Sequence, residues 1–300
     1  MCGIVAIIDL RACRPIDRDT LVRMNESQHH RGPDEGGLHL APGVGLGHRR
    51  LSIIDLATGQ QPLYNDDRSV VVIFNGEIYN YQELIAELTA LGYGFRTRSD
   101  TEVIVHAWEA WGEQCVDRFR GMFAFVLWDE KQQTVFMARD RLGVKPLYYA
   151  VLPDGHLIIG SELKSLLAHG GLARAIDPLA VEEYFALGYV PEPRTIFSSA
   201  AKLPPGHSLT VRRGASLSSS QIAPREYWDV AFTASSALSA EQASAKLIER
   251  LQESVRLRMI SEVPLGAFLS GGVDSSAVVA MMAGISSAPV NTCSPHASHA

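Results

Sequence analysis

The chain has 300 residues, of which 46% are hydrophobic and 20% are charged, an ordinary composition for a globular protein. Its formal net charge is −6, and its densest basic groups are only pairs, so nothing indicates nucleic-acid binding. The apolar runs, such as Met122–Trp128, are far shorter than the roughly 20 residues of a membrane-spanning helix. The stretch Ile4–Ile8 lacks the basic flank of a secretory signal, so we expect a cytoplasmic protein with no membrane or nucleic-acid partner.

The short strands expected in the first two hundred residues are rich in β-branched and aromatic residues. They are Ile4–Ile8, Val70–Phe74, Met122–Trp128, Thr134–Ala138, Leu147–Ala150 and His156–Ile159. Helical spacing of leucines predicts a helix over Leu84–Leu91, and Ser99–Glu102 has the pattern of a capping box that opens a second helix. Because several strands follow one another through short turns, we expect largely antiparallel sheets with helices outside, an α+β domain.

Polar segments separate this domain from a different pattern. We expect a domain over residues 2–210, a linker over 211–238, and the start of a second domain over 239–300. The second domain opens with another capping box, Ser239–Gln242, and a helix with one apolar face. Val263–Leu269 then predicts a buried strand, followed by a glycine turn and a helix, as in an α/β domain.

The four cysteines, Cys2, Cys13, Cys115 and Cys293, lie far apart without Cys-x-x-Cys spacing, so we expect free thiols. Cys2 follows the initiator methionine directly. Removal of Met1 would give Cys2 a free α-amine, whose pKa near 8 lets it accept the thiol proton without a histidine. By itself, a cysteine at position 2 is more often a coincidence than a nucleophile.

The residues after Cys2 change this interpretation. They resemble class II glutamine amidotransferases, whose domain has an N-terminal-nucleophile hydrolase fold. The matching blocks occur in the family's order: Met1–Ala6, His30–Asp34, Arg50–Asp55, Asn75–Asn80, Ser99–Glu102 and Ala138–Tyr149. The resemblance implies a four-layer αββα glutaminase domain with Cys2 as its nucleophile and no cofactor. It also implies that His30–Asp34 is a positioning loop near the pocket.

The resemblance assigns roles that suit glutamine. Arg50 would bind the α-carboxylate, and Glu77 and Asp100 would receive the α-ammonium. The Asn75 side chain and the Gly76 N–H would stabilise the oxyanion. The resemblance also implies glutamine contacts from Leu51, Ser52, Ile53 and Ile54. Taken alone, Asn75-Gly76 is typical of a hairpin turn, and Arg50 and Asp100 would be surface ion-pair residues.

A second motif, Ser270–Ser276, joins the predicted strand to the predicted helix. Its glycines, hydroxyls and helix N-terminus suit an anion, although it is not a Walker loop. It resembles the pyrophosphate-binding loop of ATP pyrophosphatases. The resemblance implies ATP contacts from Leu269, Ser270, Gly271, Gly272, Asp274, Ser275 and Ser276. Asp274 would also be a Mg²⁺ ligand.

A class II glutaminase followed by this loop is similar to the glutamine-hydrolysing asparagine synthetases. The resemblance implies that ammonia from glutamine amidates aspartate activated by ATP and Mg²⁺, and that the protein is a homodimer. Because residues 239–300 hold too few elements to close a parallel sheet, we expect a truncated second domain. Three alternatives stay open: a contribution to a complete ligase, a stand-alone glutaminase, and an inactive or partner-binding fragment.

Overall fold

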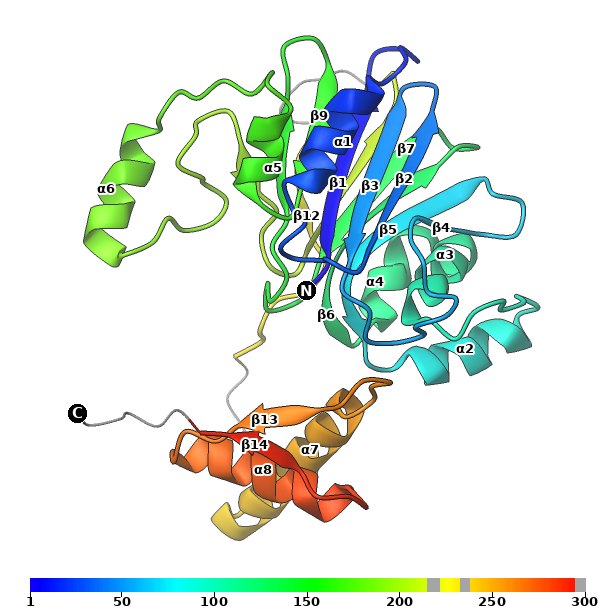
Figure 1. Ribbon diagram of the computed structural model, residues 1–300. Coiled ribbons are helices and arrows are strands. Elements are labelled where there is room, and N and C mark those ends of the chain that lie inside the picture. Colours follow the sequence, from blue (N-terminus) through cyan, green and yellow to red (C-terminus); the bar gives the residue numbers. More distant parts are fainter. Residues whose placement is uncertain (215–221, 233–237, 295–300) are drawn as a thin grey trace. The chain divides into compact units, whose positions relative to one another are not determined.

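The structure is a computed structural model that describes residues 1–214, 222–232 and 238–294 (Figure 1). The chain divides into two compact units, Met1–Asp229 and Val230–Ala300. All four cysteines are free thiols, as predicted, and Cys115 is buried. Among the described residues, no helix combines the length and apolar character needed to cross a bilayer. Parts of the predicted linker, 215–221 and 233–237, and the last residues, 295–300, lie outside the described residues.

The first unit is built on two six-stranded sheets. Their strand orders are β10-β8-β9-β1-β3-β2 and β12-β11-β7-β6-β5-β4. Every strand pair in both sheets is antiparallel, which confirms the prediction. The strands are β1 (Gly3–Asp9), β2 (Glu35–Ala41), β3 (Val44–Arg50), β4 (Leu63–Tyr64), β5 (Val70–Ile78), β6 (Gly121–Asp129), β7 (Thr134–Arg139), β8 (Tyr148–Val151), β9 (His156–Gly160), β10 (Ala201–Lys202), β11 (His207–Arg212) and β12 (Arg225–Glu226).

Helices cover the outer faces of these sheets (Figure 1). The helices of the first unit are α1 (Arg18–Glu26), α2 (Tyr81–Ala90), α3 (Asp100–Trp111), the 3₁₀ turn η1 (Gly112–Gln114), α4 (Cys115–Arg118), α5 (Leu163–Ala168) and α6 (Pro178–Leu187). Alternation of side chains along β1 shows how one sheet packs against the other sheet on one face and against helices on the other. Ile4, Ala6 and Ile8 join the core between the sheets, whereas Val5 and Ile7 pack in the cluster formed with α1 and α5.

The second sheet is covered in the same way. On β7, Val135 and Met137 face the core between the sheets, whereas Phe136 stacks on Trp108 of α3 with ring centroids 4.9 Å apart. The order helix, sheet, sheet, helix is the αββα arrangement implied by the resemblance. Each large apolar side chain buried in these layers contributes about 1.5–3 kcal/mol.

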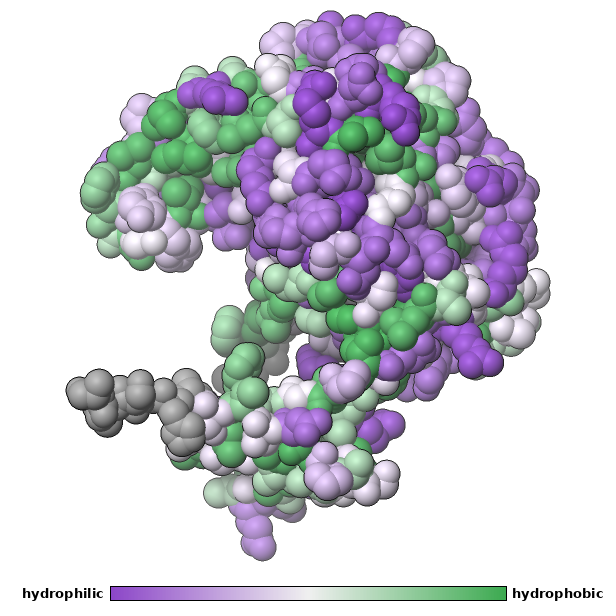
Figure 2. All heavy atoms as spheres, viewed as in Figure 1, coloured by the Kyte–Doolittle hydropathy of each residue, from purple (hydrophilic) through white to green (hydrophobic). Residues whose placement is uncertain are grey.

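Helix α6 contributes little to this core. Ala180 is its buried residue, whereas Tyr184 and Phe185 are exposed, and Figure 2 shows a hydrophobic surface over this helix. Asp177 caps the helix by accepting a hydrogen bond from the Leu179 N–H, and Pro178 occupies its first turn. Local capping therefore defines α6 more clearly than burial does.

One of the two predicted capping boxes is wrong. Ser99 does cap α3 by accepting from the Thr101 N–H, but the Ser99 N–H donates to Thr97 Oγ1 instead of to Glu102. The Glu102 carboxylate accepts from the N–H groups of Arg96 and Thr97. The buried Glu102 thus closes the loop before the helix, a role that the local pattern does not encode.

The second unit contains α7 (Ala240–Arg258), β13 (Gly266–Phe268), α8 (Val273–Ile285) and β14 (Asn291–Cys293). The capping box at Ser239 and Gln242 is confirmed. β13 pairs with β14 in parallel, and α8 connects them, as an α/β unit requires. The prediction of a buried strand over Val263–Leu269 is wrong, because only Gly266–Phe268 is extended and Phe268 is 83% exposed. In the described part of this unit, Val255 and Met282 are the buried hydrophobic side chains.

Candidate active site

A cavity of about 140 Å³ lies in the first unit, where the start of β1 meets the ends of β3 and β5 and the start of α3. A cavity of roughly 150 Å³ accommodates benzene, so this one is sized for a small molecule. Its lining residues are Met1, Cys2, Arg50, Leu51, Ile53, Ile54, Gly59, Gln61, Phe74, Asn75, Gly76, Glu77, Ser99, Asp100, Thr101, Met122 and Lys145. Of the glutamine-site residues expected from the sequence, Ser52 alone does not line the cavity.

Cys2 lies directly before β1, at the edge of this cavity. Its Sγ is 3.4 Å from the Leu51 nitrogen, which donates to it. Burial raises the pKa of the thiol, and the Leu51 N–H and the neighbouring α-ammonium act against this. Burial also lowers the pKa of the Met1 α-amine, and Arg31 and Lys145 lower it further. This amine belongs to Met1, whereas the base expected from the sequence is the α-amine that Cys2 gains when Met1 is removed.

Asn75 and Gly76 lie inside β5 and not in a turn, which excludes the hairpin interpretation. They pair with Ala124 and Phe123 of β6. A Cβ on Gly76 would lie 2.2 Å from the Met122 carbonyl oxygen, so only glycine allows this approach of the two strands. Asn75 is 1% exposed, and within the described residues neither polar atom of its amide has a hydrogen-bond partner. Such an orphaned buried amide calls for an explanation, and a bound ligand supplies one.

Arg50 ends β3 and is 4% exposed, so it is not a surface ion-pair residue. Its Nη1 donates to Glu35 Oε2 at 3.1 Å, and its Nη2 donates to the carbonyl oxygens of Ile54 and Asp55. Asp55 in turn accepts from the Arg98 N–H at 2.9 Å, which ties the loop after β3 to the segment before α3. The guanidinium is therefore fixed at the cavity wall.

Asp100 is the first residue of α3, and Ser99 caps this helix. Its Oδ2 accepts from the Ile78 N–H at 2.9 Å, and burial raises its pKa to about 7, with Glu77 adding to the effect. The cavity thus holds two carboxyl groups, from Glu77 and Asp100, and the guanidinium of Arg50. This arrangement of charges complements a zwitterionic amino acid.

The loop His30–Asp34 contacts the site from outside the cavity, as expected. Arg31 Nε donates to the Cys2 carbonyl oxygen at 2.9 Å, and Asp34 accepts from the Ser52 N–H. Arg31 is itself paired with Glu162 at 3.0 Å, a residue that sequence reasoning missed. Glu162 is 131 positions from Arg31, and no local motif marks it.

Lys145 was missed as well, although it belongs to a block that carried the resemblance. It lines the cavity, is 5% exposed, and burial lowers its pKa. Asp140 and Arg139 hold its backbone, since the Lys145 N–H donates to Asp140 and its carbonyl accepts from Arg139 Nε. The signal that could have been used is its place inside the block Ala138–Tyr149, since its burial is visible only in the structure.

The second unit carries the Ser270–Ser276 loop between β13 and α8. Gly271 has a φ of +82°, which favours glycine, and Gly272 is the N-cap of α8. Ser275 Oγ and Ser276 Oγ both contact the Gly272 carbonyl oxygen. Asp274 lies in the first turn of α8. Among the described residues, no group of three or more His, Cys, Asp or Glu side chains could hold a metal ion.

The fold and this site define a class of protein, and sequence comparison identifies it. The family described as "Glutamine amidotransferase domain" matches residues 1–228, and the chain belongs to this family. A second family, "Asparagine synthase", matches residues 246–298. The resemblance found in the sequence motifs is thus confirmed.

Curated relatives share both parts. The chain is 38% identical over 288 residues to asparagine synthetase [glutamine-hydrolyzing] 3 of Bacillus subtilis (strain 168), covering 95% of this chain and 45% of that protein. It is 34% identical to asparagine synthetase [glutamine-hydrolyzing] 2 of Oryza sativa subsp. japonica, covering 94% of this chain and 42% of that protein. The chain spans about half the length of the curated relatives it matches.

Solved structures support the fold. The glutamine phosphoribosylpyrophosphate amidotransferase of B. subtilis, complexed with ADP and GMP, matches with a TM-score of 0.54 at 15% identity. The match covers 97% of this chain and 65% of that one. At this identity the likeness concerns the fold alone, and it agrees with the N-terminal-nucleophile hydrolase fold expected from the sequence.

Proposed function

We propose that this chain hydrolyses glutamine to glutamate and ammonia with Cys2 as nucleophile, and that it is part of a glutamine-dependent asparagine synthetase. The observation that carries the first statement is the buried Asn75 amide, which has no partner in the described residues and lines the same cavity as the Cys2 thiol. A carbonyl oxygen that becomes an oxyanion would give this amide the acceptor it lacks.

The proposed reaction begins when the α-amine of Cys2, exposed by removal of Met1, accepts the thiol proton. The sulfur attacks the carboxamide carbon of glutamine, and the Asn75 amide and the Gly76 N–H stabilise the oxyanion. Collapse breaks the C–N bond, and the amine returns its proton to the leaving ammonia. Water then hydrolyses the thioester to glutamate and regenerates the thiol.

The glutamine would be held at its α-substituents. Arg50 suits the α-carboxylate because a guanidinium binds carboxylates through paired N–H donors. Glu77 and Asp100 suit the α-ammonium, since their carboxyl groups line the same cavity. Leu51, Ile53 and Ile54 would supply the wall of the pocket along the side chain.

The synthetase half of the proposal depends on the second unit. The N–H groups at the start of α8 and the Ser270–Ser276 loop are suited to the phosphates of ATP. Asp274 would be a single oxygen ligand for Mg²⁺, which often binds through one or two carboxylates and the substrate's phosphates. The acceptor would be aspartate, activated as its β-adenylate. The alternative is a chain that acts as a glutaminase alone or is an inactive fragment.

The test is to measure ammonia release from glutamine together with pyrophosphate release from ATP and aspartate, on the purified chain. Ammonia release supports the glutaminase, and its absence overturns it. Pyrophosphate release supports the synthetase, whereas ammonia without pyrophosphate indicates a glutaminase alone.

The first variant to compare is Cys2→Ala. We expect it to lower glutamine hydrolysis by at least about 10³-fold, because the nucleophile is lost, and to leave the thermal stability unchanged. Retained hydrolysis in this variant would contradict the role of Cys2. Blocking the removal of Met1 is expected to have the same effect on activity, since the base is then held in a peptide bond.

A further inference from the structure

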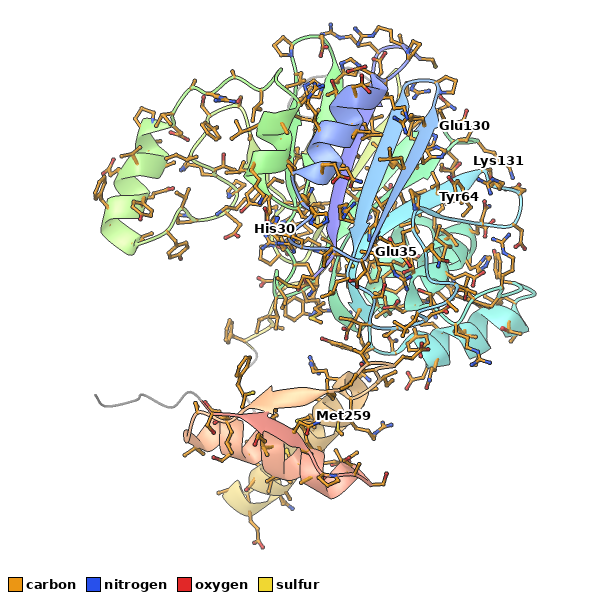
Figure 3. The ribbon with its side chains drawn as sticks, viewed as in Figure 1. His30, Glu35, Tyr64, Glu130, Lys131 and Met259 are labelled. Carbon is orange, nitrogen blue, oxygen red and sulfur yellow. The ribbon has the colours of Figure 1, made fainter. Side chains whose placement is uncertain are left out.

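We propose that Glu35 is a positioning residue for glutamine, which holds the Arg50 guanidinium in the orientation that receives the α-carboxylate. This inference rests on the proposed glutaminase function and names a residue that the sequence motifs did not single out. Figure 3 labels Glu35, which is the first residue of β2.

The contact arises from the register of two neighbouring strands. Glu35 is paired directly with Arg50 in the antiparallel β2–β3 ladder, so their side chains leave the sheet on the same face. Glu35 Oε2 accepts from Arg50 Nη1 at 3.1 Å. The Arg50 side chain is 5% exposed and the Glu35 side chain 37% exposed, so one end of this ion pair is well shielded from water.

The position of Glu35 distinguishes a supporting role from a competing one. A carboxylate inside the cavity would occupy the place of the substrate carboxylate and weaken binding. Arg50 lines the cavity, but Glu35 does not. Glu35 therefore contacts the guanidinium from outside the cavity and leaves the substrate side open.

Some of the N–H donors of Arg50 are engaged by protein contacts, and the others are not. A guanidinium has five N–H donors. Contacts in the described part of the chain engage three of them, one with Glu35 and two with the carbonyl oxygens of Ile54 and Asp55. No contact in the described part of the chain engages the other two, the Nε–H and one Nη1–H. Of these three anchors, only Glu35 contributes a side chain, so only this anchor can be removed by substitution.

The neighbouring arginine provides a matched control. Arg49 Nη1 pairs with Glu26 Oε1 at 3.2 Å, and the Arg49 side chain is 11% exposed. Neither residue lines the cavity. Glu26→Gln therefore removes the same charge from a similar ion pair on the adjacent residue, and neither member of that pair lines the cavity.

The experiment compares the wild-type chain, Glu35→Gln and Glu26→Gln by ammonia release, with thermal unfolding of each. For Glu35→Gln we expect the KM for glutamine to rise roughly tenfold while kcat stays within about twofold. Glu26→Gln is expected to match the wild type in both. A second substrate, γ-aminobutyramide, keeps the amide and the amine of glutamine but lacks the α-carboxylate. Its kcat/KM is expected to be the same in Glu35→Gln and the wild type.

The outcomes separate the two proposals. No ammonia from the wild-type chain overturns the glutaminase function itself. An active wild type whose KM is unchanged in Glu35→Gln overturns the role of Glu35 alone. An equal loss with γ-aminobutyramide, or an equal change in Glu26→Gln, would show general damage to the site and also overturn it. A lowered KM would show that Glu35 competes with the substrate.

Discussion

At the scale of single residues, Asn75 and Asn80 are two buried asparagines on the same stretch of chain with opposite surroundings. Asn80 Nδ2 donates to the Arg118 carbonyl, and its Oδ1 accepts from the Arg120 N–H. Neither polar atom of the Asn75 amide has a partner in the described residues. A buried amide without hydrogen bonds costs about 1–3 kcal/mol, so Asn75 is favoured by function and not by stability.

This contrast predicts opposite effects of two alanine substitutions. Asn75→Ala should lower kcat about 10²–10³-fold, as the loss of one oxyanion donor does. Its free energy of unfolding should change by no more than about 1 kcal/mol, because removing the unpaired amide offsets the lost packing. Asn80→Ala should lose about 1–3 kcal/mol of stability and keep its kcat. Steady-state kinetics and urea unfolding of both variants are the measurements, and equal stability losses would contradict the argument.

The proposed contact of Asp100 with the α-ammonium predicts that glutamine binding depends on pH. The pKa of Asp100 is about 7 because the carboxyl group is buried. Only the ionised form attracts an ammonium group, so the KM for glutamine should rise roughly tenfold from pH 8 to pH 6. Asp100→Asn should have a high KM at every pH in this range. A KM of the wild type that does not change with pH would refute this role.

Ionisation of the Asp100 carboxyl group should strengthen glutamine binding but lower the stability of the fold. Its pKa is raised from about 3.9 in the unfolded chain. Its contribution to stability is therefore fully present below about pH 4 and is lost as the pH rises through about 7. Asp100→Asn should consequently melt at a higher temperature than the wild type at pH 8, with a smaller difference at pH 5. Calorimetry at the two pH values measures this.

At the scale of the elements, the pairing of β5 with β6 places Asn75 and Gly76, the proposed oxyanion donors. Gly76 and Gly121 both sit where a Cβ would lie little more than 2 Å from a carbonyl oxygen of the opposite strand. These glycines let the two strands approach closely, and this fixes the backbone N–H of Gly76 at the cavity.

Gly76→Ala should therefore disrupt both the strand pair and the reaction. We expect a loss of more than about 2 kcal/mol in the free energy of unfolding, as for other strained or overpacked sites, and no measurable glutamine hydrolysis. Gly94→Ala is the control, because a Cβ there meets no atom within 4 Å. Urea unfolding of both variants tests this, and a Gly76→Ala variant as stable as Gly94→Ala would show that the strands can move apart.

At the scale of the whole molecule, the two units differ in how much apolar surface they bury. Strand β1 is buried along its whole length between two hydrophobic clusters. In the described residues of the second unit, Val255 and Met282 are the buried hydrophobic side chains. Local stability follows burial, so the two units should open independently and at different free energies.

Hydrogen exchange measures this difference. The amides of β1 and β5 should exchange only by global unfolding of the first unit, whereas those of β13 and β14 should exchange much faster. Matching protection in the two units would show that the second unit is stabilised by contacts that its own core does not explain.

The sequence alone could predict the chemistry of the site and much of the fold. Short apolar runs rich in β-branched and aromatic residues predict β1, β5, β6 and β7, because strands buried on both faces need them. The resemblance of the motifs to class II glutamine amidotransferases implies that Cys2, Arg50, Asn75 and Asp100 belong to one glutamine site. These residue types suit the proposed substrate, since a thiol, a guanidinium, an amide and a carboxyl group can each interact with one part of glutamine.

Strand β3 could not be predicted in this way, because close packing replaces the usual residues with glycine. A Cβ on Gly45 would contact Leu21 of α1 at 3.1 Å, and one on Gly47 would lie 2.7 Å from Val5. The strand therefore lacks the β-branched pattern by which strands are recognised. The glycines of β3 are required by the close packing of neighbouring elements and do not themselves favour a strand.

The supporting contacts were decided by tertiary structure alone. Glu35 reaches Arg50 through the register of β2 and β3, and Glu162 reaches Arg31 across 131 positions of sequence. Whether Asn75-Gly76 forms a turn or a strand interior also depended on β6, which supplies the pairing partner. Local sequence determined which groups are present, because each is chemically required. Only the folded chain determined their orientation and burial, because these depend on residues that are distant in sequence.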